Sequence, residues 1–154
     1  MLINKLNADL INTKRIYLHD SKIMHTECFL EERKIVISIY PDKLYSNIIK
    51  MTFNNVVGTK TTLFEVFGMC SGEIIDFYLL KGDEARLTNE LYEDSEREKA
   101  RITSYNDKGE KIESEHYSNI DDREGLIEVE FFLVSADRLT IVCESIEIET
   151  ENDS

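Results

Sequence analysis

Apolar side chains at every second position near the end of the chain constrain its fold more than any other feature. Between residues 127 and 133 the odd positions carry isoleucine, valine, phenylalanine and leucine, whereas Glu128 and Glu130 stand between them. Successive side chains of a strand point to opposite faces, so this pattern predicts a half-buried β-strand. Residues 139–143 repeat the pattern and predict a second strand.

The apolar phase then changes. The odd positions are apolar up to Cys143, and the even positions Ile146 and Ile148 are apolar after it. A slip of one residue within a strand is typical of a β-bulge, which puts an extra residue on one strand. We therefore predict a bulge near Glu144-Ser145.

Four further extended segments lie upstream. Residues 23–30 and 35–40 flank a short polar stretch and predict a β-hairpin, which Pro41 ends because proline cannot donate to a ladder. Residues 49–54 alternate cleanly and predict a half-buried strand. Residues 74–80 are almost wholly apolar and predict a buried strand.

The remaining segments have other patterns. Apolar residues three to four positions apart within 2–12 predict a short helix, and 55–62 are expected to form a polar turn. Residues 83–101 are acidic and rich in helix formers, so we expect an exposed helix or a mobile insertion. A turn-like Asn-Asp-Lys-Gly within 102–117 predicts a second, polar hairpin. The acidic tail 149–154 is expected to fray.

These elements predict an α+β fold that is mainly antiparallel β. Strands joined by hairpins favour a curled sheet or a β-sandwich, here with one or two short helices. The chain of 154 residues has the size of one domain, and we expect a single domain over 1–154.

The charge balance bears on partners. The chain has 18 basic and 31 acidic residues and a net charge of −13. Binding to nucleic acid or anionic lipid needs clustered cations, and the densest basic spots are the pairs Lys14-Arg15 and Arg33-Lys34. We therefore expect no nucleic-acid or membrane partner. Acidity suits a basic protein partner, although it also serves solubility alone.

Three cysteines, Cys28, Cys70 and Cys143, are scattered and form no CxxC pair. The pattern predicts neither a zinc knuckle nor a redox dithiol, and we expect small buried side chains in a reduced compartment. The sequence also shows no signal peptide and no apolar run long enough to span a membrane, which predicts a cytoplasmic protein.

His19, Asp20 and His25 are the weak candidates for a metal site, because imidazole and carboxylate groups are common metal ligands. His19 and Asp20 instead suit a turn whose polar groups satisfy backbone amides, and an extended chain would carry His25 away from them. We favour the structural interpretation. The sequence supplies no motif for a catalytic residue or a cofactor.

A resemblance to known proteins rests on Leu18-His19-Asp20-Ser21-Lys22-Ile23, the hairpin through residues 35–39, and Met51-Thr52-Phe53-Asn54-Asn55-Val56. This opening resembles a loose set of small uncharacterised bacterial β-rich proteins that begin with His-Asp-Ser or His-Asp-Ala. Some of that set are classed as immunity proteins of toxin systems. The resemblance implies a sheet-rich fold and a toxin partner, and it implies no catalytic residues.

Three hypotheses of function follow. The first is a non-enzymatic interaction module, of the immunity-inhibitor type, that binds a basic protein. The second is a metal-binding protein or metal-dependent enzyme built around His19 and Asp20. The third is a β-sheet domain that binds a small molecule. Edge strands also permit a homodimer.

Overall fold

The computed structural model shows a chain built mainly of antiparallel strands. The described residues are 1–13, 16, 18–41, 47–62, 72–101, 104–105, 107–112 and 125–152. The position of Cys70 lies outside these ranges.

Five strands form the first sheet, in the order β1-β11-β4-β3-β2, and every neighbouring pair is antiparallel. Its strands are β1 (Leu2–Asn4), β2 (Lys22–Phe29), β3 (Lys34–Tyr40), β4 (Asn47–Asn54) and β11 (Ser145–Asn152). The predicted hairpin is confirmed as β2 and β3, and the predicted strand at 49–54 is confirmed as β4.

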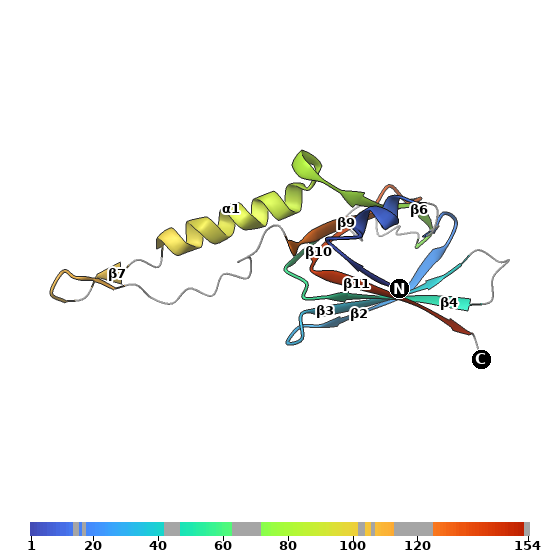
Figure 1. Ribbon diagram of the computed structural model, residues 1–154, viewed down its shortest axis with the longest axis horizontal. Helices are drawn as coiled ribbons and strands as arrows, with labels where there is room; N and C mark the ends of the chain where they lie inside the picture. The colour runs from blue at the N-terminus through green and yellow to red at the C-terminus, as the bar shows by residue number, and fades with distance from the viewer. Residues whose placement is uncertain are drawn as a thin grey trace.

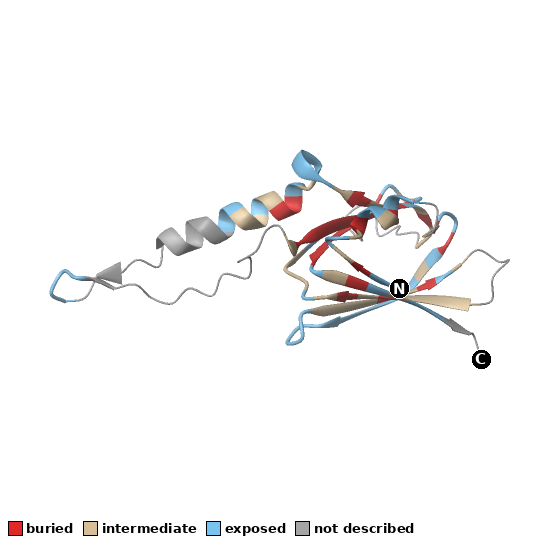
Figure 2. Ribbon diagram, viewed as in Figure 1, coloured by how far each residue is buried: buried red, intermediate tan, exposed pale blue. Residues whose placement is uncertain are grey.

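Four strands form the second sheet, in the antiparallel order β5-β10-β9-β6. Its strands are β5 (Gly58–Thr61), β6 (Ile74–Leu80), β9 (Ile127–Leu133) and β10 (Arg138–Cys143). The two sheets lie one above the other (Figure 1), and buried residues concentrate on β9 and β10 (Figure 2). The predicted mainly antiparallel α+β fold is confirmed.

The core lies between the two sheets and is built on three phenylalanines. Phe53 of β4 and Phe131 of β9 meet edge to face, with ring centroids 6.3 Å apart, so this contact joins the sheets. Phe77 of β6 lies 4.5 Å from the Phe131 ring within the second sheet. Edge-to-face and tilted aromatic pairs add to the stabilisation that burial already provides.

The predicted bulge at Glu144-Ser145 is wrong in kind. The chain leaves the second sheet after Cys143 and enters the first at Ser145, with a bend at Glu144. The inner face changes from odd to even positions because the strand passes from one layer to the other, which is how sandwich corners form. Register shifts occur elsewhere, between Ile23 and His25 and between Ile74 and Asp76.

Three other predictions need correction. The helix predicted over 2–12 is strand β1 followed by the 3-10 helix η1 (Ala8–Asn12), because Leu2–Asn4 pair with β11. The predicted turn over 55–62 contains β5, which pairs with β10. The tail predicted to fray from residue 149 is paired with β4 as far as Asn152. In each case the partner strand is distant in sequence.

The acidic segment predicted over 83–101 is helix α1 (Arg86–Arg101), which follows a short 3-10 turn, η2 (Gly82–Glu84). Helix α1 runs outward from the sandwich, and β7 (Ser104–Tyr105) lies beyond its far end (Figure 1). Strand β7 pairs with β8 (Lys111–Ile112), as the second predicted hairpin requires, although several residues of 102–117 lie outside the described ranges.

Two of the cysteines can be placed. Cys143 is buried, as predicted, and burial raises the pKa of its thiol to about 12. Cys28 is exposed on β2, contrary to the prediction, because β2 is an edge strand with little cover on either face. Across the described part of the chain, no helix is both long and apolar enough to cross a membrane.

Candidate ligand-binding site

Two glutamates on β9 face away from the core of the sandwich and are nevertheless buried. Glu128 is 3% exposed and Glu130 is 7% exposed, although both alternate with the apolar residues that point inward. Carboxylates are rarely buried unless they are paired or hydrogen-bonded. Other parts of the protein must therefore cover these two glutamates and donate hydrogen bonds to them on the outer face of this sheet.

Glu128 caps the beginning of α1. Its Oε1 accepts hydrogen bonds from the Thr88 backbone N–H at 2.6 Å and from the Thr88 hydroxyl at 2.7 Å, and its Oε2 accepts from the Leu87 N–H at 3.4 Å. The first N–H groups of a helix have no partner within the helix, and its N-terminus attracts negative charge. The first turn contains no acidic residue, so Glu128 supplies that charge from the sheet.

The first turns of α1 rest on the outer face through a small apolar cluster. Leu87, Leu126 and Val142 are buried together, and Leu91 packs against them. Gly58 of β5 makes this approach possible, because a Cβ at that position would lie 2.4 Å from Cδ1 of Leu91. The helix therefore covers one end of the outer face and leaves the other end uncovered.

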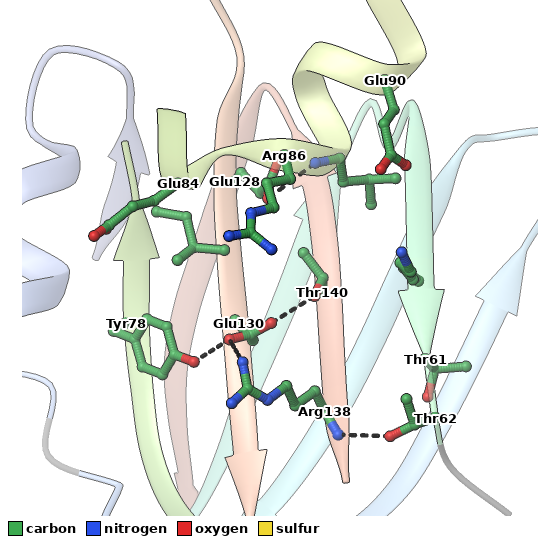
Figure 3. A pocket seen from close by; sticks show the side chains of 13 residues that line it. Thr61, Thr62, Tyr78, Glu84, Arg86, Glu90, Glu128, Glu130, Arg138 and Thr140 are labelled. Atoms are coloured by element: carbon green, nitrogen blue, oxygen red, sulfur yellow. Dashed lines mark hydrogen bonds and ion pairs between the residues drawn. The ribbon is translucent and has the colours of Figure 1, made fainter. Parts of the chain in front are cut away.

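A cavity of about 530 Å³ occupies the uncovered end, between the beginning of α1 and the outer face of β5, β10, β9 and β6. Glu130 lies on its floor, and Arg86 reaches into it from the beginning of the helix (Figure 3). Leu80 and Leu87 supply an apolar part of the wall. The volume falls in the range of small-molecule sites.

Side chains of the two neighbouring strands, β6 and β10, hold Glu130 in place. The Tyr78 hydroxyl of β6 donates to its Oε2, and the Thr140 hydroxyl of β10 donates to its Oε1 at 3.0 Å. One terminal guanidinium nitrogen of Arg138 lies 3.5 Å from Oε2. Burial and the contact with Glu130 raise the pKa of Tyr78 to about 12, so this hydroxyl stays protonated and donates at neutral pH.

Charged side chains of both signs surround this floor. Lys60, Arg86, Glu84 and Glu90 line the cavity and are exposed. Within the part of the chain that the structure describes, no side-chain hydrogen bond or ion pair joins any of these four to another residue. Arg138 is 56% exposed at its side chain and also lies over the Phe132 ring, 5.1 Å from its centroid.

A second cavity, of about 770 Å³, also reaches Glu128 and is lined by η1, η2, the beginning of α1 and the ends of β6 and β9. Its charged wall residues Lys81 and Asp9 form an ion pair with each other. Lys5 and Glu128 also line this cavity, and Glu128 accepts hydrogen bonds from the beginning of α1.

His19 and Asp20 lie in a corner that joins the two sheets. The Asp20 N–H donates to the Ile74 carbonyl at 2.9 Å, and the Ile74 N–H donates to the Ser21 carbonyl at 2.7 Å. His19 Nδ1–H donates to the Ile75 carbonyl at 2.7 Å. That bond, and then the charge of Asp20 at 3.5 Å, raise the pKa of His19. These contacts support the structural interpretation of the corner.

His25 lies on the exposed edge strand β2, where its Nε2 is 2.7 Å from Oε1 of Glu27. Neither His19 nor Asp20 takes part in this contact. Among the described residues, no group of three or more histidine, cysteine or acidic side chains is arranged to hold a metal ion.

The sequence did not single out the residues of the cavity. The alternation pattern places Glu128 and Glu130 on the solvent-exposed face of a strand, and Tyr78 lies in an apolar run. One signal was present: the two glutamates interrupt the otherwise apolar strand β9, which β10 and β6 both flank. On a central strand, side chains of both neighbouring strands can bury a carboxylate that points away from the core.

Comparisons with protein-family models, with curated proteins and with solved structures found no match. The resemblance to immunity-type proteins stays a prediction, and the candidate function depends on the geometry of the cavity.

Proposed function

We propose that this protein is a non-enzymatic binding module that takes a small polar ligand into the cavity above Glu130. The observation that carries the proposal is a buried carboxylate, fixed by donors from two neighbouring strands, on the floor of an open cavity. Ligand sites combine apolar wall with a few convergent polar groups, as this cavity does.

A contribution to stability does not by itself explain why a carboxylate is buried at position 130. Desolvating a carboxylate is costly, and apolar residues of similar volume often serve a buried position as well or better. A fixed and nearly buried carboxylate at a site open to ligand is therefore better explained by recognition. The contacts from Tyr78, Thr140 and Arg138 occupy most of its lone pairs, which favours a positioned acceptor over a proton-transferring base.

The test is a ligand-observed NMR screen of a polar metabolite library that contains amino acids, organic acids, sugars and nucleotides. Binding should be found for the wild-type protein and lost in Glu130→Gln, which keeps the shape of the side chain. Glu147→Gln, on the exposed face of β11, is the matched control. No ligand in the screen, or equal binding by Glu130→Gln, would contradict the proposal.

A second candidate is the predicted interaction module for a basic protein, which a different surface favours. The β2–β3 hairpin exposes Met24 at 55%, Phe29 at 37% and Leu30 at 86%. Glu31 and Glu32 are exposed beside them. Apolar groups next to carboxylates suit a partner surface that is apolar and basic.

Affinity capture from native lysate at low and high salt tests this candidate. A basic protein should bind to the wild-type chain, dissociate at high salt, and fail to bind a Phe29→Ser/Leu30→Ser variant. Glu147→Gln again serves as control. Capture that the double substitution leaves unchanged would count against the hairpin as the interface.

A further inference from the structure

The charged side chains around the cavity fall into two groups: those that already form hydrogen bonds within the protein, and those that do not. Glu128 is committed to the beginning of α1, and Glu130 has protein donors on both of its oxygens. Lys60 and Arg86 have no recorded ion pair within the described residues. Among the described residues, two cations without an ion-pair partner therefore lie in the same cavity as a fixed carboxylate, and Glu84 and Glu90 line its edge.

Arg86 and Glu130 face the same open space without touching. Figure 3 shows the Arg86 guanidinium directed into the cavity from the beginning of α1, and the Glu130 carboxylate on the strand opposite. No ion pair joins these two described residues, whereas Arg138 does reach Glu130. Opposite charges that share a cavity without contact leave room for a molecule that meets both.

We infer that the cavity binds a zwitterion of the α-amino-acid class, an inference that rests on the proposed function. Arg86 binds the ligand carboxylate, since its planar guanidinium matches carboxylate geometry, and Lys60 adds a second cation. Glu130 accepts from the ligand ammonium. In an α-amino acid the two charged groups are neighbours, so one small molecule can satisfy both sides of the cavity.

The wall agrees with a ligand that also has an apolar part. Leu80 is half-buried, Leu87 is buried, and both line the cavity beside the charged groups. A ligand with only a negative charge would meet Glu130, Glu84 and Glu90 unfavourably, and a ligand with only a positive charge would meet Lys60 and Arg86 unfavourably. A zwitterion with an aliphatic or aromatic side chain avoids both penalties.

The experiment uses the full chain and the standard L-amino acids, tested in pools by saturation-transfer NMR and then singly by calorimetry. The best amino acid is compared with its decarboxylated amine and with its deaminated acid. Each analogue should bind at least about tenfold more weakly, because each leaves a charged protein group without its partner.

Variants locate the site. Arg86→Gln and Glu130→Gln should each weaken the amino acid by about tenfold or more, and Arg86→Gln should no longer distinguish the amino acid from the amine. Lys22→Gln, an exposed lysine of β2, should bind as the wild type does. Circular dichroism and the melting temperature establish that each variant is folded.

The outcomes separate this inference from the proposed function. An amino acid that binds no better than its deaminated acid, or pools that contain no binder, would overturn the zwitterion assignment. If the metabolite library still contains a ligand that Glu130→Gln loses, the cavity remains a ligand site with another specificity. If neither screen contains a binder, both proposals fail.

Discussion

Glu128 and Glu130 show how two identical side chains on one face of one strand acquire different roles from their neighbours. Glu128 lies beneath the first turn of α1 and accepts hydrogen bonds from its backbone. Glu130, two residues further along, lies beyond the helix and accepts from side chains of β6 and β10. The first carboxylate anchors an element, and the second forms the floor of a cavity.

The role of Glu128 predicts the effect of its substitution. Glu128→Gln removes the negative charge at the beginning of α1 and one acceptor oxygen, and should lower the free energy of unfolding by about 1–2 kcal/mol. Urea denaturation measures this change, and amide exchange at Leu87 and Thr88 should accelerate. Glu147→Gln is the exposed control, and equal stability of the two variants would contradict the capping role.

Tyr78 predicts a dependence of stability on high pH. Burial and the contact with Glu130 raise its pKa from 10.0 to about 12 in the folded chain. Between these values the unfolded state has released the proton and the folded state still holds it, so stability falls as pH rises. Cys143, with its pKa raised to about 12, contributes a similar loss, starting from its ordinary value of 9.0.

Removing the hydroxyl should remove the part of this pH dependence that Tyr78 causes. In Tyr78→Phe the free energy of unfolding should fall less steeply from pH 10 to pH 11 than in the wild type. Absorbance titration should show one fewer late-titrating tyrosine. An unchanged slope, together with the loss of a tyrosine that titrates near pH 10 instead of a late-titrating one, would show that Tyr78 ionises as an ordinary surface tyrosine.

At the scale of elements, the position of α1 decides where a cavity can exist. The cap by Glu128, the apolar contacts of Leu87 and Leu91, and the missing side chain at Gly58 hold its first turns over one end of the outer face. The mean hydropathy of the chain is −0.33, and this helix is among its more polar segments, so these few contacts carry its docking.

The contact between Gly58 and Leu91 can be tested by a double-mutant cycle. Gly58→Ala puts a methyl group against the end of the Leu91 side chain and should cost about 1–3 kcal/mol. The same substitution in a Leu91→Ala background should cost less than about half of that, because the obstruction is gone. Additive costs would show that Gly58 matters for its backbone alone.

At the scale of the whole molecule, the two larger sheets share one core, and the path from β10 to β11 joins them. The bend at Glu144 carries the chain from one layer to the other, and the His19-Asp20-Ser21 corner ties the beginning of β2 to the beginning of β6. The bend and the corner both lie where one sheet meets the other, and such connections join the layers of a sandwich.

Phe131 lies at the centre of the aromatic cluster in the core, since it contacts Phe53 of the first sheet and Phe77 of the second. Phe131→Ala should lower the free energy of unfolding by about 3–5 kcal/mol, through lost burial and the cavity left behind. Phe132→Ala, next in sequence on the outer face, should cost clearly less. Denaturant unfolding of both variants measures the difference, and equal losses would contradict a core that lies on one side of β9.

The sequence by itself determined most of the elements of this fold. Alternation identified β4, β9 and β10, and a nearly continuous apolar run identified β6. A polar break identified the β2–β3 hairpin, and helix-forming composition identified α1. These signals are local, because a strand or a helix displays its period within its own residues. The short strands β1 and β5 were missed because their pairing partners, rather than their own patterns, make them strands.

Tertiary structure alone decided the candidate site. Periodicity reports which face of β9 is polar, and it does not report what lies over that face. The burial of Glu128 and Glu130, the approach of Arg86, and the meeting of Tyr78, Thr140 and Arg138 depend on segments 40 or more residues apart, or on neighbouring strands. Burial and hydrogen bonding are properties of the surroundings of a residue, and only the folded chain supplies those surroundings.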